Sequence, residues 1–124
     1  MLDDKEPIAT VAVRDLGVAK TFYRDKLGLK LSDENTEVLT FKAGAFQLFV
    51  YRSTFAGTNQ GTAVTWMVGQ EVDEIAKALA AKGVVFEHYD MHGLKLEGDL
   101  HVAGDMKVGW FKDPDGNILS INGM

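Results

Sequence analysis

The sequence repeats a pattern of structural elements at a fixed offset of 55 residues. Three pairs of positions share this offset and mark a strand end, a helix end and the next strand: Val13 and Val68, Gly28 and Gly83, and Leu31 and Phe86. Repeated units of this kind usually stack, because neither buries its apolar face alone. The 124-residue chain is therefore predicted to contain two similar units with a shared core.

Each half predicts the element order β-α-β-β-β. Alternating and β-branched segments predict strands, and apolar residues spaced by three and four predict helices. The expected strands are residues 8–13, 29–31, 38–41 and 46–51, then 63–68, 84–88, 106–111 and 118–121. One helix is expected between Asp15, as its N-cap, and Gly28, and another between Val72 and Gly83. Residues 33–35 are expected to form a turn.

Two further segments lie outside this pattern. Residues 53–61 are polar and contain glycine, which predicts a linker between module 1 (about 7–52) and module 2 (about 62–122). Residues 89–105 form a 17-residue insert in the second module. A structureless loop of that length is more often functional than accidental. We expect residues 1–124 to form one domain.

Composition narrows the classes of function. The chain has 13 Lys and Arg against 18 Asp and Glu, a formal net charge of −5 without a basic cluster, so nucleic acid is not an expected partner. The lack of cysteine excludes disulfides, thiolate metal sites and cysteine nucleophiles. No apolar run reaches the roughly 18 residues of a membrane span, and the polar N-terminus is unlike a signal peptide. We expect a cytoplasmic protein that does not bind membranes.

Several motifs together resemble a known family. They are Ala12-Val13-Arg14-Asp15-Leu16, Phe22-Tyr23, Leu27-Gly28 and Phe111-Lys112-Asp113-Pro114-Asp115-Gly116-Asn117. In this order and spacing they are similar to the glyoxalase/bleomycin-resistance/extradiol-dioxygenase superfamily, also called vicinal oxygen chelate. The resemblance covers nearly the whole chain. It implies an α+β fold of two tandem βαβββ modules, whose curled mixed sheets surround a central cleft with the helices outside.

The resemblance also implies four metal-ligand positions on the first and fourth strands of the modules. Matched motif by motif onto this chain, they are Ile8, Leu48, Ala63 and Ser120. A divalent ion needs imidazole nitrogens or carboxylate oxygens, and none of the four residues supplies one. A one-residue slip would give Gln47 or Thr62, which is still no convincing ligand set. We therefore expect no metal and no cofactor, and the family's metal-dependent chemistry loses its Lewis acid.

The three histidines, His88, His92 and His101, lie in or beside the insert and outside those four positions. If they approach one another, with Asp90, Asp99 and Asp105 near by, they form a site unlike that of the family. Their spacing does not match a pair of ligands on one helix. The structural alternative is a solvated loop, with His88 at the end of a strand.

Other polar and aromatic residues have structural interpretations. Asp15 is predicted to cap a helix rather than to act in catalysis, and Asp113 and Asp115 are predicted to be turn residues. Trp66 is predicted to lie in the core, on the helix-facing side of its strand. The sequence does not decide whether Trp110 lies in the core or in the cleft. In the cleft its indole N–H would need a hydrogen-bond partner.

The predicted cleft is mostly apolar with a few hydroxyl groups, which is typical of a small-molecule pocket. Its expected lining is Ile8, Thr10, Ala12, Leu48, Ala63, Thr65, Met67, Trp110 and Ser120, with Tyr89, His92 and His101 added by the insert as a lid or rim. No catalytic residue can be named from the sequence. Such a lining favours an apolar or cationic ligand over an anionic one.

These observations favour a metal-free small-molecule-binding protein of this family, with sequestration of a toxic or antibiotic compound as its role. The alternative is a metal-dependent lyase, isomerase or dioxygenase with a rearranged site near His88, His92 and His101. A partner-binding or regulatory module is a third interpretation. Because members of the family commonly pair, the resemblance also implies a homodimer.

Overall fold

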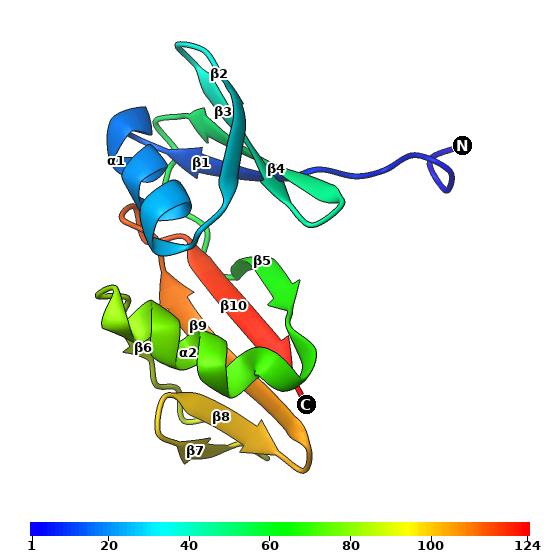
Figure 1. Ribbon diagram of the computed structural model, residues 1–124, viewed down its shortest axis with the longest axis vertical. Helices are drawn as coiled ribbons and strands as arrows, with labels where there is room; N and C mark the ends of the chain where they lie inside the picture. The colour runs from blue at the N-terminus through cyan, green and yellow to red at the C-terminus, as the bar shows by residue number, and fades with distance from the viewer. The chain divides into compact units, whose positions relative to one another are not determined.

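The computed structural model describes all residues from Met1 to Met124. The chain forms two compact units, residues 1–56 and 57–124, which are described separately below. Each unit combines one mixed sheet with helical segments (Figure 1). The predicted α+β class and its βαβββ units are confirmed. No helix of the chain is both long enough and apolar enough to cross a membrane.

The first unit contains a four-stranded sheet. In spatial order its strands are β1 (Ala9–Val13), β4 (Phe46–Arg52), β3 (Val38–Ala43) and β2 (Lys30–Glu34). β1 and β4 are parallel, and the other two pairs are antiparallel. The helical segments α1 (Leu16–Lys20) and η1 (Thr21–Lys26) connect β1 to β2.

The first helix begins and ends where the sequence predicts. The Asp15 carboxylate accepts a hydrogen bond from the Val18 N–H at 3.1 Å, which satisfies one of the unpaired donors of the first turn. After α1 the chain widens into the π-helix η1, where the Leu27 N–H donates to the carbonyl of Phe22 at 3.1 Å. Gly28 follows with a φ of +75°, a conformation that glycine adopts without strain.

One face of the first sheet is buried and the other is not. Tyr23 from η1 is fully buried, and its ring centroid lies 5.9 Å from that of Phe41 on β3. The buried strand residues alternate along each strand, as expected for a sheet covered on one side. They are Val11 and Val13 on β1, Leu39 and Phe41 on β3, and Leu48 and Val50 on β4.

The turn predicted at residues 33–35 is wrong in its position. Asp33 and Glu34 belong to β2 and pair with β3. The turn begins at Asn35, whose side-chain oxygen accepts hydrogen bonds from the N–H groups of Glu37 and Val38 at 2.8 and 2.9 Å. This strand lies at the edge of the sheet, and its last three residues are all exposed. Polar residues can therefore extend it.

The second unit contains a six-stranded sheet. Its main path runs through β5 (Thr62–Met67), β10 (Ile118–Gly123), β9 (Met106–Lys112), β8 (Leu100–Ala103) and β7 (Lys95–Glu97), and β6 (Phe86–Glu87) also pairs with β9. Only β5 and β10 are parallel. The 3₁₀ turn η2 (Gly69–Glu71) and the helix α2 (Val72–Ala81) connect β5 to β6.

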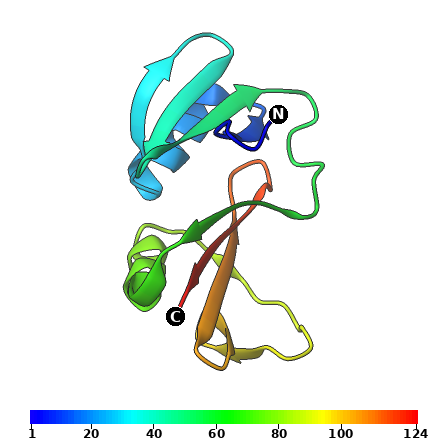
Figure 2. The ribbon, with the colours of Figure 1, turned by 90° about the vertical axis from the view of Figure 1, so that its right-hand side faces the viewer.

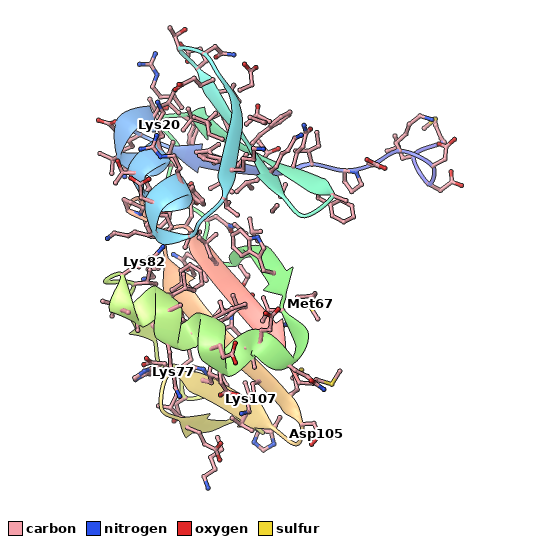
Figure 3. The ribbon with its side chains drawn as sticks, in the orientation of Figure 1. Lys20, Met67, Lys77, Lys82, Asp105 and Lys107 are labelled. Carbon is pink, nitrogen blue, oxygen red and sulfur yellow. The ribbon has the colours of Figure 1, made fainter.

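Helix α2 covers one face of this sheet (Figure 2). On that face, Lys107 of β9 forms an ion pair with Asp73 of α2 at 2.9 Å (Figure 3). Beneath the helix lie Phe111 and Leu119, which are both almost fully buried. The helical layer covers only this face, and on the opposite face Ser120, Val108 and His101 are buried as well.

The 89–105 insert is not structureless, which corrects the sequence prediction. Its second half contains β7 and β8, and β8 continues the sheet by pairing with β9. Both strands are short, so they show too few alternating residues for a strand signal. The strand predicted at 84–88 is also shorter than expected, because only Phe86 and Glu87 pair with β9.

The last hairpin is built around Asp113, as predicted. Its Oδ1 accepts hydrogen bonds from the N–H groups of Asp115 and Asn117, both at 2.9 Å, and its Oδ2 accepts one from the Asn117 side chain at 2.8 Å. Asp113 is buried, and these contacts satisfy its carboxylate. Its role in the fold is therefore structural.

We expect Gly123→Ala to destabilise the second unit. A Cβ at Gly123 would overlap the carbonyl oxygen of Gly69 and lie 2.6 Å from the Cβ of Val72, so the backbone would have to move. Overpacking of this kind costs about 1–3 kcal/mol of unfolding free energy, measurable by urea denaturation. Gly61→Ala is the control, since its nearest neighbouring atom is 3.7 Å away. Equal stabilities of the two variants would contradict this packing.

Candidate functional site

The surfaces available for a ligand are the sheet faces that the helices leave uncovered. We call each of these the free face of its unit. Because strand side chains alternate, every strand position can be assigned to the helix-covered face or to the free face. The free faces of the two units are described in turn.

The free face of the second unit is defined by Ser120 on β10. Ser120 pairs with Thr65 on β5 and with Trp110 on β9, and cross-strand partners lie on the same face. Its chain neighbours Leu119 and Ile121 are buried on the opposite face, beneath α2. Thr65, Trp110 and Ser120 therefore come together on the free face.

Hydroxyl groups on this face are paired with one another and with the indole. The Thr65 Oγ1 and Ser120 Oγ atoms are 2.7 Å apart and share a hydrogen bond. The indole N–H of Trp110 donates to Thr62 Oγ1 at 3.3 Å, which supplies the partner it needs. Trp110 thus lies on the free face of the sheet and not beneath α2.

The other predicted residues of β5 divide between the two faces. Trp66 pairs with the buried Ile121, so it shares the helix-covered face, as predicted, but it is only half-buried and does not belong to the core. Met67 pairs with Asn122 on the free face, is 77% exposed, and projects away from the sheet (Figure 3). Ala63 lies where the β5–β10 register shifts, so no residue of β10 pairs with it.

His101 lies on the free face but is not part of an open rim. His101 on β8 pairs with Val108 on β9, which pairs in turn with Asn122 on β10, so the three residues lie on the same face. The His101 side chain is nevertheless 0% exposed. Its ring centroid is 6.0 Å from that of Tyr89 and 4.9 Å from that of Trp110. The segment before β7 lies on the side of the sheet away from α2 (Figure 2). The expectation of a rim residue is therefore wrong.

Two buried polar atoms on this face have no hydrogen-bond partner. They are His101 Nδ1 and Asn122 Oδ1. The other ring nitrogen of His101, Nε2, accepts from the Tyr89 N–H at 2.8 Å. Burying an unpaired polar atom costs about 1–3 kcal/mol, so such atoms are unusual in a finished core. Sequence reasoning missed Asn122, although its position two residues after Ser120 on one strand puts it on the same face.

The three histidines do not form a common site. His88 Nε2 is 2.9 Å from Asp99 Oδ1, whereas His92 is exposed and His101 is enclosed by aromatic rings. No three His, Asp or Glu side chains of the chain are grouped so that they could hold a metal ion. The arrangement of histidines considered from the sequence is therefore not formed.

The first unit has a pocket of about 460 Å³ at the start of β1 and β4. It is lined by Glu6, Pro7, Ile8, Lys42, Gly44, Ala45, Phe46 and Gln47. Ile8 lies in it, and Thr10 follows on the exposed free face of β1. The predicted lining residue Leu48 does not lie there, because it is 2% exposed and pairs with the buried Phe41. The predicted position of Leu48 is one residue out of register, and such a shift exchanges the two faces of a strand.

The four positions implied as metal ligands do not fit a divalent ion. Ile8 and Ala63 are hydrocarbon side chains, and Leu48 is a hydrocarbon side chain in the core. Ser120 offers a hydroxyl that is bonded to Thr65. These residues supply no imidazole and no carboxylate, the groups that hold such ions in proteins.

Two βαβββ units, each with a free sheet face, define the fold class of this protein. The model of the Glyoxalase/Bleomycin resistance protein/Dioxygenase superfamily matches residues 7–121. The chain belongs to this superfamily. No curated protein sequence matches it.

Several solved structures share the fold at low sequence identity. The genomically encoded fosfomycin resistance protein from Listeria monocytogenes is 15% identical, with a TM-score of 0.74 over 98% of this chain and 93% of that one. A glyoxalase/bleomycin resistance protein/dioxygenase from Alicyclobacillus acidocaldarius is 20% identical, with a TM-score of 0.73 over 97% and 91%. Lactoylglutathione lyase from Agrobacterium tumefaciens is 18% identical, with a TM-score of 0.72 over 98% and 95%.

We expect Thr65→Val and Ser120→Ala to be energetically coupled. Each change removes one partner of the 2.7 Å hydrogen bond and leaves the other hydroxyl without it. Each single variant should lose about 1 kcal/mol of unfolding free energy, and the double variant should lose about 1 kcal/mol less than the sum. Ser120→Ala combined with Lys77→Ala, at an exposed position of α2 on the other side of the same sheet, is the control, with additive effects. Additive losses for Thr65 and Ser120 would contradict the hydrogen bond.

Proposed function

We propose that this protein binds an apolar or cationic small molecule without a metal ion and sequesters it, as a toxic or antibiotic compound. The proposal is supported by the residues at the four positions where the family places its metal ligands. In this chain their side chains are hydrocarbons or, at one position, a hydroxyl group. Such groups bind organic molecules by contact and hydrogen bonding, and they do not hold a Lewis acid.

The free face of the second unit has the groups that such binding needs. The Trp110 ring offers an aromatic edge or face for stacking, and the Thr65–Ser120 pair offers hydroxyl donors and acceptors. Met67 is exposed and flexible, so it can adapt to ligands of different shape. In the first unit, Phe46 and Gln47 offer an aromatic ring and an amide in the pocket.

The similar structures include both a resistance protein and a lyase, so the second candidate is an enzyme of the superfamily. His101, the buried histidine of the free face, is enclosed between the rings of Tyr89 and Trp110. A general acid or base must come within hydrogen-bond reach of the substrate. This burial favours binding without turnover.

We expect ligands to quench the fluorescence of Trp110 and not that of Trp66. Compounds that raise the melting temperature are first selected from a panel of aromatic antibiotics and catechols. They are then titrated against Trp110→Phe and Trp66→Phe, the same substitution on opposite faces of one sheet. Quenching should persist in Trp66→Phe and disappear in Trp110→Phe. Quenching that persists only in Trp110→Phe would contradict binding at this face.

We expect the purified protein to contain far less than one equivalent of Zn, Mn, Fe or Ni, because the family ligand positions lack suitable donors. Elemental analysis before and after EDTA treatment measures this. Near-stoichiometric metal that survives EDTA would support the metal-dependent enzyme instead. Turnover of a selected compound, lost in His101→Ala, would do so as well.

We also propose that residues 1–124 act as one domain and that two chains pair as a homodimer. The match of a single family model from residue 7 to residue 121 supports the first statement. The second rests on the resemblance, and light scattering during gel filtration tests it. A cytoplasmic location is proposed because the chain lacks cysteine and contains no helix fit to cross a membrane.

A further inference from the structure

We propose that the pocket at the start of β1 and β4 binds a zwitterion, a small molecule that carries a carboxylate and an ammonium group on an apolar body. An α-amino acid with an apolar side chain is the simplest ligand of this class. The inference rests on the proposed function, because this pocket is one of the two surfaces offered there to a ligand. It adds a carboxylate to the apolar and cationic groups already proposed for that ligand.

Side chains from neighbouring strands form one row on the free face of the first unit, next to the pocket. Lys42 on β3 pairs with Gln47 on β4 and with Lys30 on β2, so these three side chains share a face. The parallel register of β1 and β4 places Ile8, just before β1, beside Gln47. The row therefore presents two ammonium groups and an amide next to a hydrocarbon side chain.

A tight hairpin shapes the wall of the pocket beside this row. Ala43 pairs with Phe46, so only Gly44 and Ala45 connect β3 to β4. Gly44 has a φ of +61°, as the first central residue of a two-residue type II′ hairpin requires. The charged and amide groups of the row therefore extend from a well-defined backbone.

The pocket contains two opposite charges that no other group of the chain neutralises. Glu6, from the segment before β1, and Lys42 both line it, and both are exposed. Neither side chain forms an ion pair or a hydrogen bond within the chain. Both charges are therefore available to a ligand.

Lys30 adds a second ammonium group directly opposite Lys42. Like charges at opposed positions of two strands repel each other. The carboxylates of β2 do not relieve this repulsion, because Glu34 pairs with Lys20, and Asp33, opposite Thr40, forms no ion pair. A ligand carboxylate bound by the two opposed ammonium groups would relieve it.

A zwitterion matches these charges better than an ion of one sign does. A simple anion would be attracted by the two lysines and repelled by Glu6, and a simple cation would meet the reverse. A ligand with both groups can place its carboxylate against the lysines and its ammonium group against Glu6, with charge-assisted hydrogen bonds at both ends. The volume of about 460 Å³ suits a small ligand, whose apolar body can contact the hydrocarbon part of the lining, Pro7, Ile8 and Ala45.

The test is a titration of the full chain with three compounds of similar size, followed by calorimetry and by amide NMR shifts. L-Phenylalanine carries both charges, phenethylamine carries only the ammonium group, and 3-phenylpropionate carries only the carboxylate. We expect L-phenylalanine to bind saturably, with shifts at residues 42–47, and each single-charge compound to bind about tenfold more weakly. Equal affinity of either single-charge compound, or no saturation by L-phenylalanine, would overturn the proposal.

Substitutions in the pocket should act on opposite ends of the ligand. Lys42→Gln should weaken L-phenylalanine binding by about tenfold without weakening phenethylamine, because only the carboxylate loses its partner. Glu6→Gln should weaken L-phenylalanine without weakening 3-phenylpropionate, and Lys30→Gln should weaken both compounds that carry a carboxylate. Substitutions that change the affinities of all three compounds alike would contradict this assignment of the charges.

Lys26→Gln is the matched control. It removes the same charge from the same unit, but Lys26 belongs to η1, on the helix-covered side of the sheet. It should leave the affinities of all three compounds unchanged. Weakening equal to that of Lys42→Gln would show a general effect of net charge and would overturn the proposal.

The fluorescence of Trp110 separates this inference from the proposed function. If selected compounds quench Trp110 but L-phenylalanine does not saturate the chain, the zwitterion site is wrong and the proposed function stands. If no compound binds in either assay, both proposals are wrong.

Discussion

Each sheet of this protein buries only one of its faces against its own helical layer, and the rest of the structure depends on that constraint. In the first unit the buried face centres on Tyr23 and Phe41, and in the second on Phe111 and Leu119. Because side chains alternate along a strand, burial of one set fixes the other set on the opposite face. The free faces with their hydroxyl and aromatic groups therefore follow from the core.

Local patterns in the sequence were sufficient to predict the elements that are stabilised by interactions between residues close in the chain. The N-cap at Asp15, the helix end at Gly28 and the turn around Asp113 depend on residues within a few positions, and all three were predicted correctly. The end of β2 was predicted wrongly because Asp33 and Glu34 are polar residues of an exposed edge strand. Both residues pair with β3, but they are polar and exposed, so the alternation of apolar and polar residues that indicates a strand is absent there.

The candidate site was less predictable because it depends on register and on contacts between distant segments. A shift of one residue moved Leu48 from the core to the cleft in the prediction. The face of Trp110 was settled only by its pairing with Ser120. The burial of His101 arises from the rings of Tyr89 and Trp110, which no local pattern reports. Asn122 was missed for the same reason, since its unpaired oxygen is a property of the assembled sheet.

The π-helical segment η1 has a consequence for sequence divergence in this family. A π-turn closes its hydrogen bond over five residues, as Leu27 does with Phe22, and so contains one residue more than an α-turn. Loss of one residue between Lys20 and Leu27 would convert the segment to an ordinary α-helix. The deletion would also rotate the helical residues on one side of it relative to the sheet. Related chains that lack the π-turn should therefore bury a different helix position where this chain buries Tyr23.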